Sequence, residues 1–187
     1  MDNIGSPSTT RVPMAAYDRL SILIHWAIFV LVVTVCTLGF LFYKLDYRTS
    51  QAYASYYYWH RSLGEIIFVL TIFSVFRRTT RTPPPEFPDV PWRATVARVT
   101  KSLLLVLLIL VPAFKLWRGA YGTMGWTFFA WHIPGIWPPN EPLGRFLTAA
   151  HYYSALALIF LSALHSLAAI WHQFVKRDSL LKRMSPL

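Results

Sequence analysis

Four long apolar stretches constrain this chain more than any other feature of its sequence. They cover residues 20–43, 53–76, 99–120 and 145–175, and each is long enough to cross the hydrocarbon core of a bilayer as a helix. Of the 187 residues, 55% are hydrophobic and only 14% are charged, which is unlike an ordinary soluble domain. The sequence therefore predicts an all-α fold, a transmembrane four-helix bundle with up-down-up-down helices.

The basic residues predict which side of the membrane each loop occupies. The net charge is +10, and the cations cluster at the ends of the apolar stretches and not along an aromatic-bearing groove, so we expect no nucleic-acid partner. If both termini and the loop between the second and third spans share one side, that side holds twelve of the eighteen Lys and Arg residues. These are Arg11, Arg19, Arg77, Arg78, Arg81, Arg93, Arg98, Lys101, Lys176, Arg177, Lys182 and Arg183. The positive-inside rule then places both termini in the cytoplasm.

Three of the segments outside the predicted spans have a distinctive composition. Residues 1–16 are polar and rich in helix breakers, so we expect a flexible cytoplasmic tail before a single domain over residues 17–187. Residues 79–92 contain five prolines and are expected to link two helical hairpins on the inner side. Residues 121–144 combine Gly, Pro and Trp, which indicates an ordered loop at the outer membrane interface. The single cysteine, Cys36, excludes an internal disulfide and a cysteine-ligated iron–sulfur cluster.

The histidines carry the functional argument, because an imidazole in hydrocarbon costs free energy unless it is paired, hydrogen-bonded or bound to a metal. Four of the six lie well within the predicted spans, namely His25, His60, His151 and His165. Of the other two, His132 lies in the outer loop and His172 lies near the inner end of the last span.

Depth in the membrane predicts how the four intramembrane histidines pair. The depth of each histidine follows from the number of residues between it and the basic residue at the inner end of its helix, multiplied by the helical rise of about 1.5 Å per residue. Pairing His25 with His165 and His60 with His151 leaves offsets of about 7 and 12 Å, whereas pairing His25 with His151 misses by about 28 Å. The sequence thus predicts two levels, each with two histidines from different helices.

Two facing imidazoles in an apolar bundle core are typical of the axial ligands of a low-spin b-type haem. Zinc or a di-iron site would need Cys, Asp or Glu beside the histidines, and Glu65 is the one clear carboxylate within the spans. Gly64 follows His60 by one helical turn and could let a flat ring approach the backbone, or it could be a helix-packing glycine.

Three motifs are similar to those of the prokaryotic cytochrome b561 family of di-haem, four-helix proteins of the bacterial inner membrane. They are YDRLSILIHW at residues 17–26, WHRSLG at residues 59–64, and HYYSALALIFLSALHSLAAIWHQFVKRDSLLKRM at residues 151–184. The similarity extends over residues 17–186. The resemblance implies that His25 and His165 ligate a haem on the cytoplasmic side, and that His60 and His151 ligate a haem on the periplasmic side.

The same resemblance implies electron transfer between the periplasmic face and membrane ubiquinone, with superoxide as the electron donor in at least one branch of the family. An alternative is an accessory or membrane-anchor subunit that relays electrons for a partner protein of a larger dehydrogenase or photosynthetic complex. A non-redox protein with structural histidines is a third reading. The chain departs from the family pattern at Arg98 and Lys101, and again at Lys115, Trp117 and Arg118.

Several other residues are candidates for contacts with substrate or cofactor. His172 could donate a proton to a quinone, together with Asp18 or Asp178, pair with a haem propionate, or simply form hydrogen bonds at the interface. On the outer side, Lys115 and Arg118 are candidates for steering an anion such as superoxide inward. Arg61 beside His60 could pair with a haem propionate, and Lys44 and Arg48 could reach lipid headgroups. His132 and the Tyr and Trp residues of the outer side are expected to lie at the surface and in an interfacial belt.

Overall fold

A computed structural model describes residues 16–81, 91–122, 125–178 and 180–185. The elements in chain order are α1 (Arg19–Tyr43), α2 (Gln51–Thr80), α3 (Pro91–Ala120), β1 (Trp126–Phe128), β2 (Trp131–Ile133) and α4 (Glu141–Trp171), which continues as the π-helical turn η1 (His172–Lys176) and is followed by the 3₁₀ turn η2 (Leu180–Met184). The predicted tail at residues 1–16 and the proline-rich linker at residues 79–92 fall largely outside the described residues.

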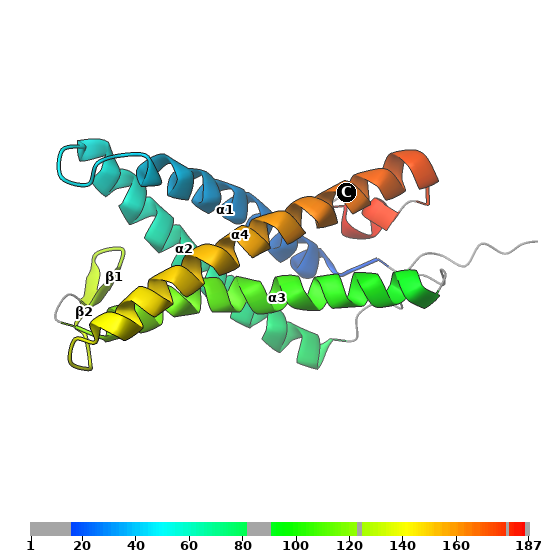
Figure 1. Ribbon diagram of the computed structural model, residues 1–187. Helices are drawn as coiled ribbons and strands as arrows, with labels where there is room; N and C mark the ends of the chain where they lie inside the picture. The colour runs from blue at the N-terminus through cyan, green and yellow to red at the C-terminus, as the bar shows by residue number, and fades with distance from the viewer. Residues whose placement is uncertain (1–15, 82–90, 123–124, 179, 186–187) are drawn as a thin grey trace, which may run out of the picture.

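The four long helices confirm the predicted fold class. Each is long and apolar enough to cross a membrane. They alternate in direction, so that α1 and α3 begin at the end of the bundle where α2 and α4 finish (Figure 1). We call the end that holds Asp18, Thr80 and η2 the inner end, and the opposite end, with β1 and β2, the outer end.

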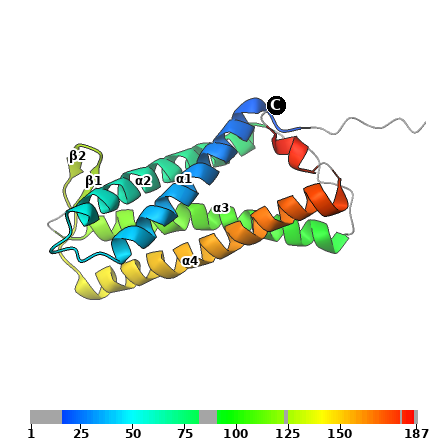
Figure 2. The same cartoon turned by 90° about the horizontal axis from the view of Figure 1, so that it is seen from above.

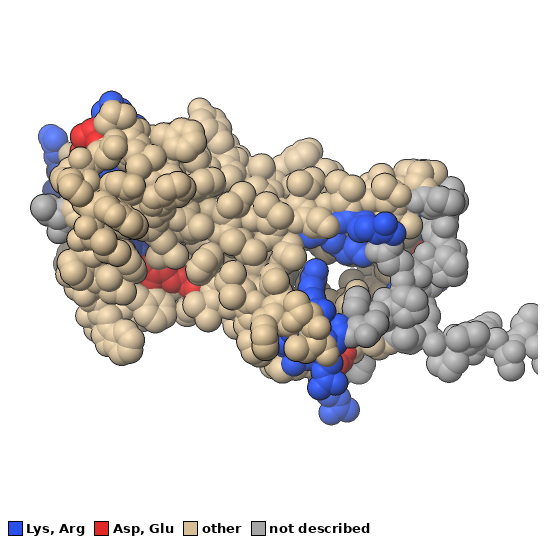
Figure 3. Space-filling model, turned by 90° about the horizontal axis from the view of Figure 1, so that it is seen from below, with Lys and Arg blue, Asp and Glu red and all other residues tan. Residues whose placement is uncertain are grey.

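The surface of the bundle is apolar over most of its length. Large side chains such as Leu23, Val33 and Phe160 are more than half exposed. In the view of Figure 3, Lys and Arg gather toward the two ends of the molecule. Because exposed hydrocarbon of this extent is costly in water and favourable in lipid, the arrangement is that of a multi-pass membrane protein.

The bundle is built from two helical hairpins, α1–α2 and α3–α4. Packing within each hairpin is more extensive than packing between them. Figure 2 shows the hairpin of α1 and α2 along one side of the molecule and the hairpin of α3 and α4 along the other. The helices that bear the paired histidines, α1 with α4 and α2 with α4, therefore belong to different hairpins.

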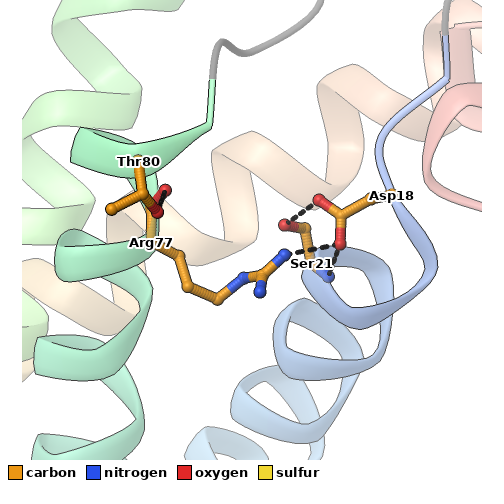
Figure 4. Close-up of polar contacts among 4 residues, drawn as sticks. All are labelled: Asp18, Ser21, Arg77 and Thr80. Carbon is orange, nitrogen blue, oxygen red and sulfur yellow. Dashed lines mark hydrogen bonds and ion pairs between the residues drawn. The ribbon is translucent and has the colours of Figure 1, made fainter.

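Helix α1 begins where a side chain can cap it. The Asp18 carboxylate accepts hydrogen bonds from the Ser21 amide (3.1 Å) and the Ser21 hydroxyl (2.7 Å), as expected of an N-cap aspartate. The Arg77 guanidinium near the end of α2 donates to the same carboxylate at 2.7 Å (Figure 4). This ion pair ties the two ends of the first hairpin together at the inner side.

The structure differs from the sequence expectations mainly beyond the hydrocarbon core. Helix α3 starts at Pro91, earlier than the predicted residue 99, because its first turns are polar and hydropathy does not register them. The outer loop contains an antiparallel hairpin in which Thr127 lies opposite His132. After η1 the chain folds back, so that the Tyr17 amide donates to the Arg183 carbonyl (3.2 Å) and the Trp26 indole donates to the Met184 carbonyl (2.7 Å). These contacts close the inner end of α1.

The Asp18 cap predicts a pH-dependent loss of stability. The hydrogen bonds from Ser21, followed by the charge of Arg77, hold the pKa of Asp18 below its ordinary value. A carboxyl with a lowered folded-state pKa stabilises the fold above its ordinary pKa of about 4, and this contribution is lost as the pH falls through the folded-state value. Asp18→Asn should therefore unfold at a lower temperature than the wild type near neutral pH, and the gap should close in acid. Thermal unfolding across pH measures this, and a gap that is unchanged in acid would contradict it.

Candidate functional site

The outer histidine pair joins all four long helices. His60 of α2 and His151 of α4 face each other with ring centroids 6.1 Å apart and ring planes at 78°. The Nδ1 atom of His60 lies 2.8 Å from the Val35 carbonyl oxygen of α1, and Nδ1 of His151 lies 2.8 Å from the Val111 carbonyl oxygen of α3. Because a carbonyl can only accept, each Nδ1 carries the proton, and each Nε2 is left with a lone pair.

The inner pair has a similar ring geometry at the other level of the bundle. The rings of His25 in α1 and His165 in α4 have centroids 6.4 Å apart and planes at 73°. The Trp26 indole packs edge-on against His25, with ring centroids at 5.7 Å. The structure thus brings together the two couples that depth in the membrane predicted, and it separates the crossed ones.

The geometry of both pairs fits two ligands on opposite sides of one metal ion. A transition metal bonds an imidazole nitrogen at about 2 Å, so two trans nitrogens lie about 4 Å apart and their ring centres roughly 6 Å apart. Rings that share such an axis can have any angle between their planes. Among the described residues, no three His, Cys, Asp or Glu side chains gather as they would for zinc or a di-iron site. The donor set is therefore suited to a metal whose other ligands come from a macrocycle.

Two glycines near the outer pair have different surroundings. A Cβ atom added at Gly39 in α1 would lie 3.1 Å from His60 Cε1 and 3.2 Å from its Nδ1, so the missing side chain lets the imidazole reach the Val35 carbonyl. Gly39 was missed by sequence reasoning, although an isolated glycine within an apolar helix is a signal of close packing. A Cβ atom added at Gly64 would meet nothing within 4 Å. Open space there is compatible with the approach of a flat ring, which is one of the two roles that the sequence left open.

Cationic side chains lie on the face of α3 between the outer pair and the outer end. Lys115 lies one turn beyond Val111 and within electrostatic range of both His60 and His151. Arg118 packs onto α4, where its Nε would lie 2.8 Å from a Cβ atom added at Gly144, and its Nη1 donates to the Tyr121 carbonyl at 3.4 Å. The two cations thus form a stripe that leads from the outer end toward the outer pair.

Helix α2 adds a second charged group near His60. The Arg61 guanidinium carbon lies 5.8 Å from the centroid of the Tyr57 ring. Its Nε atom and Glu65 Oε2 are both buried without a hydrogen-bond partner in the described part of the chain. Phe42 packs edge-on against His60 with ring centroids at 5.1 Å, so one side of the imidazole is covered by an aromatic ring.

The remaining candidates lie apart from the two pairs. His172, at the start of η1, lies with its Nδ1 2.5 Å from Asp178 Oδ2. Asp18 instead pairs with Arg77, so of the two carboxylates suggested by the sequence, Asp178 is the one beside His172. His132 is exposed on β2, where its Nδ1 lies 3.3 Å from the Thr127 hydroxyl.

This chain is similar in sequence to known proteins over nearly their whole length. A family model described as prokaryotic cytochrome b561 matches residues 16–186. "Cytochrome b561 homolog 1" of Escherichia coli (strain K12) is 23% identical over 92% of this chain and 98% of its own length. "Probable superoxide oxidase CybB" of Yersinia pestis is 30% identical over 91% of this chain and 96% of its own length. "Cytochrome b562" of Cereibacter sphaeroides is 29% identical over 90% of this chain and 94% of its own length.

The family match and the helical bundle lead to the same conclusion. The matched region contains all four spans and both histidine pairs. The chain belongs to the prokaryotic cytochrome b561 family, whose members bind b-type haem and transfer electrons in the bacterial inner membrane.

Proposed function

We propose that this protein carries electrons across the inner membrane between the periplasmic face and the quinone pool, and that it binds two b haems to do so. The observation that carries the proposal is the pair of imidazole couples at two levels of one apolar bundle. Haem, when bound, supplies one-electron redox chemistry. The protein supplies the ligands, the apolar surroundings and the nearby charges, which together tune the potential.

The four histidines of the two pairs would hold the two haems. His60 and His151 would hold one haem through their Nε2 atoms, because the Val35 and Val111 carbonyls occupy both Nδ1 protons. His25 and His165 would hold the other. Arg61 is the proposed partner of a propionate group, since its Nε atom is buried without a hydrogen bond in the described part of the chain.

The orientation of the bundle follows from its cations. We place both termini in the cytoplasm, since Arg77, Arg78, Lys176 and Arg177 lie at the inner ends of α2 and η1. The couple of His25 with His165 then lies toward the cytoplasm, and the couple of His60 with His151 lies toward the periplasm. Residues 17–187 form one domain in this proposal.

Superoxide is the proposed electron donor at the periplasmic face. The relative from Yersinia pestis bears the name of a probable superoxide oxidase. In this chain, the stripe of Lys115 and Arg118 supplies positive charge between the outer end and the outer pair, which attracts an anion. Two superoxide ions would each lose one electron to become dioxygen, and one ubiquinone would take up the two electrons and two protons to become ubiquinol.

Ubiquinone reduction is proposed at the cytoplasmic side. His172 is the candidate proton donor, because it lies at the cytoplasmic side and Asp178 holds its ring in place. His172 follows His165 by seven residues on the same helical path, about 10 Å closer to the cytoplasm. This spacing supports a role on the cytoplasmic side of the inner haem and not as a ligand of it.

Replacing a proposed ligand should remove one haem. His151→Ala should lower the haem content from about two per protein to about one, since one axial bond and its anchor are lost. His165→Ala should do the same for the other level, and the double variant should be colourless. Haem-to-protein stoichiometry and oxidised-minus-reduced spectra measure this. His132→Ala, at an exposed histidine outside the pairs, should keep both haems, and unchanged visible bands in His151→Ala would refute the assignment.

The contact between Gly39 and His60 gives a second test. Gly39→Val places methyl groups where the imidazole lies, so His60 should be pushed away from the Val35 carbonyl and the outer haem should bind more weakly. Haem content and the visible spectrum report this loss. Phe40→Val, at the neighbouring residue that is 52% exposed, is the matched control and should retain both haems. Full occupancy in Gly39→Val would show that the close approach of His60 is not required.

Electrostatic steering predicts a dependence on salt. Superoxide-dependent ubiquinone reduction should slow as ionic strength rises, because salt screens the attraction between the cations and the anion. Lys115→Gln with Arg118→Gln should lower the rate at low salt by about tenfold and flatten the salt response. Lys44→Gln with Arg48→Gln, two other outer cations, is the charge-matched control. A rate in the wild type that does not change with salt would count against steering. If the protein co-purifies with a partner protein and shows no superoxide activity of its own, an accessory electron-transfer subunit would be favoured instead.

A further inference from the structure

A cavity at the inner end of the bundle has no role in electron transfer as described above. One part of it, about 300 Å³, is lined by Gln173, Phe174, Arg177 and Lys182. The adjoining part, about 330 Å³, is also lined by Gln173, Phe174 and Lys182, and it extends to Trp26, Leu181 and Ser185. The cavity therefore combines a cationic mouth with an apolar wall.

The two cations of the mouth have no acidic partner among the described residues. The nearby carboxylate of Asp178 bonds instead to His172 and to the Leu180 amide. Neighbouring cations of the same segment are held elsewhere, since Lys176 lies 5.3 Å from the Trp171 ring and Arg183 lies 5.9 Å from the Tyr17 ring. Arg177 and Lys182 are thus the cations of this segment that face the cavity, and both are exposed.

The wall of the cavity adds a hydrogen-bond acceptor and a hydrocarbon surface. Gln173 Oε1 is buried and lacks a hydrogen-bond partner in the described part of the chain, so a ligand that donates an O–H would satisfy it. Phe174 is 71% exposed, and its ring would lie against lipid at this depth. A ligand that meets all three features carries an anionic group, a hydroxyl group and an acyl chain.

From this combination we propose that the cavity binds the headgroup of an anionic phospholipid of the inner leaflet, of the phosphatidylglycerol class. Arg177 and Lys182 would bind the phosphate through charge-assisted hydrogen bonds, Gln173 would accept from a glycerol hydroxyl, and an acyl chain would lie along Phe174. The bound lipid would fasten η2 to the end of α4. This site does not depend on the electron donor or acceptor proposed above.

The experiment compares lipid binding to the haem-loaded protein and to two charge-matched variants. Native mass spectrometry would count phosphatidylglycerol and phosphatidylcholine retained on the protein, and thermal unfolding with each added lipid would measure stabilisation. Arg177→Gln with Lys182→Gln removes the two cations of the mouth. Arg78→Gln with Arg81→Gln removes two cations at the inner end of α2, outside the cavity. Equal haem content in all three proteins verifies that they are folded.

The proposal expects selective retention of phosphatidylglycerol by the wild type and by the control variant. The mouth variant should bind it about tenfold or more weakly, because each lost cation removes a charge-assisted hydrogen bond to the phosphate. Gln173→Leu should reduce the preference for phosphatidylglycerol over phosphatidic acid, which lacks the glycerol hydroxyls.

Four outcomes would overturn the proposal. The first is that the wild type shows no preference for phosphatidylglycerol over phosphatidylcholine. The second is that the control variant loses as much lipid binding as the mouth variant, which would indicate general attraction to the membrane surface. The third is that free glycerol phosphate binds as strongly as the lipid, which would indicate a phosphate site, and the fourth is that a short-chain ubiquinone analogue displaces the lipid, which would indicate a quinone site.

Discussion

The hydrogen bond from an imidazole Nδ1 to a backbone carbonyl of another helix is the interaction on which the outer half of this bundle depends. A histidine in a membrane span has two polar ring nitrogens that lipid cannot satisfy. For His60 and His151, one nitrogen is satisfied by the Val35 and Val111 carbonyls. The other is left facing the partner histidine, with its lone pair available for a metal. The same bond that satisfies the ring also selects its tautomer and its direction.

These bonds also fix how the two helices within each hairpin lie against each other. His60 joins α2 to α1 within the first hairpin, and His151 joins α4 to α3 within the second. The two imidazoles then face each other across the boundary between the hairpins, where packing is less extensive. A cofactor bound by both would therefore connect the hairpins through its axial bonds. Gly39 allows this arrangement, since a side chain there would meet the His60 ring.

The two ends of the bundle are organised by charge in different ways. At the outer end, Lys115 and Arg118 lie between helices and lead toward a histidine pair. At the inner end, Asp18 and Arg77 join α1 to α2, and the segment after α4 folds back onto Tyr17 and Trp26. The apolar surface between these ends faces lipid. Cations thus lie beside a histidine pair at the outer end, whereas an ion pair and the folded-back segment close the inner end.

The sequence by itself determined the four spans, their alternating direction and the pairing of histidines by depth, because hydropathy, span length and the helical rise depend only on order along the chain. It identified the family through motifs around His25, His60 and His151. The role of Gly39 and the fold-back of η2 were decided by tertiary structure. Each depends on which surfaces meet across helices that are distant in sequence. The Val35 and Val111 carbonyls show this most clearly, since nothing in a valine marks its backbone oxygen as the partner of a histidine on another helix.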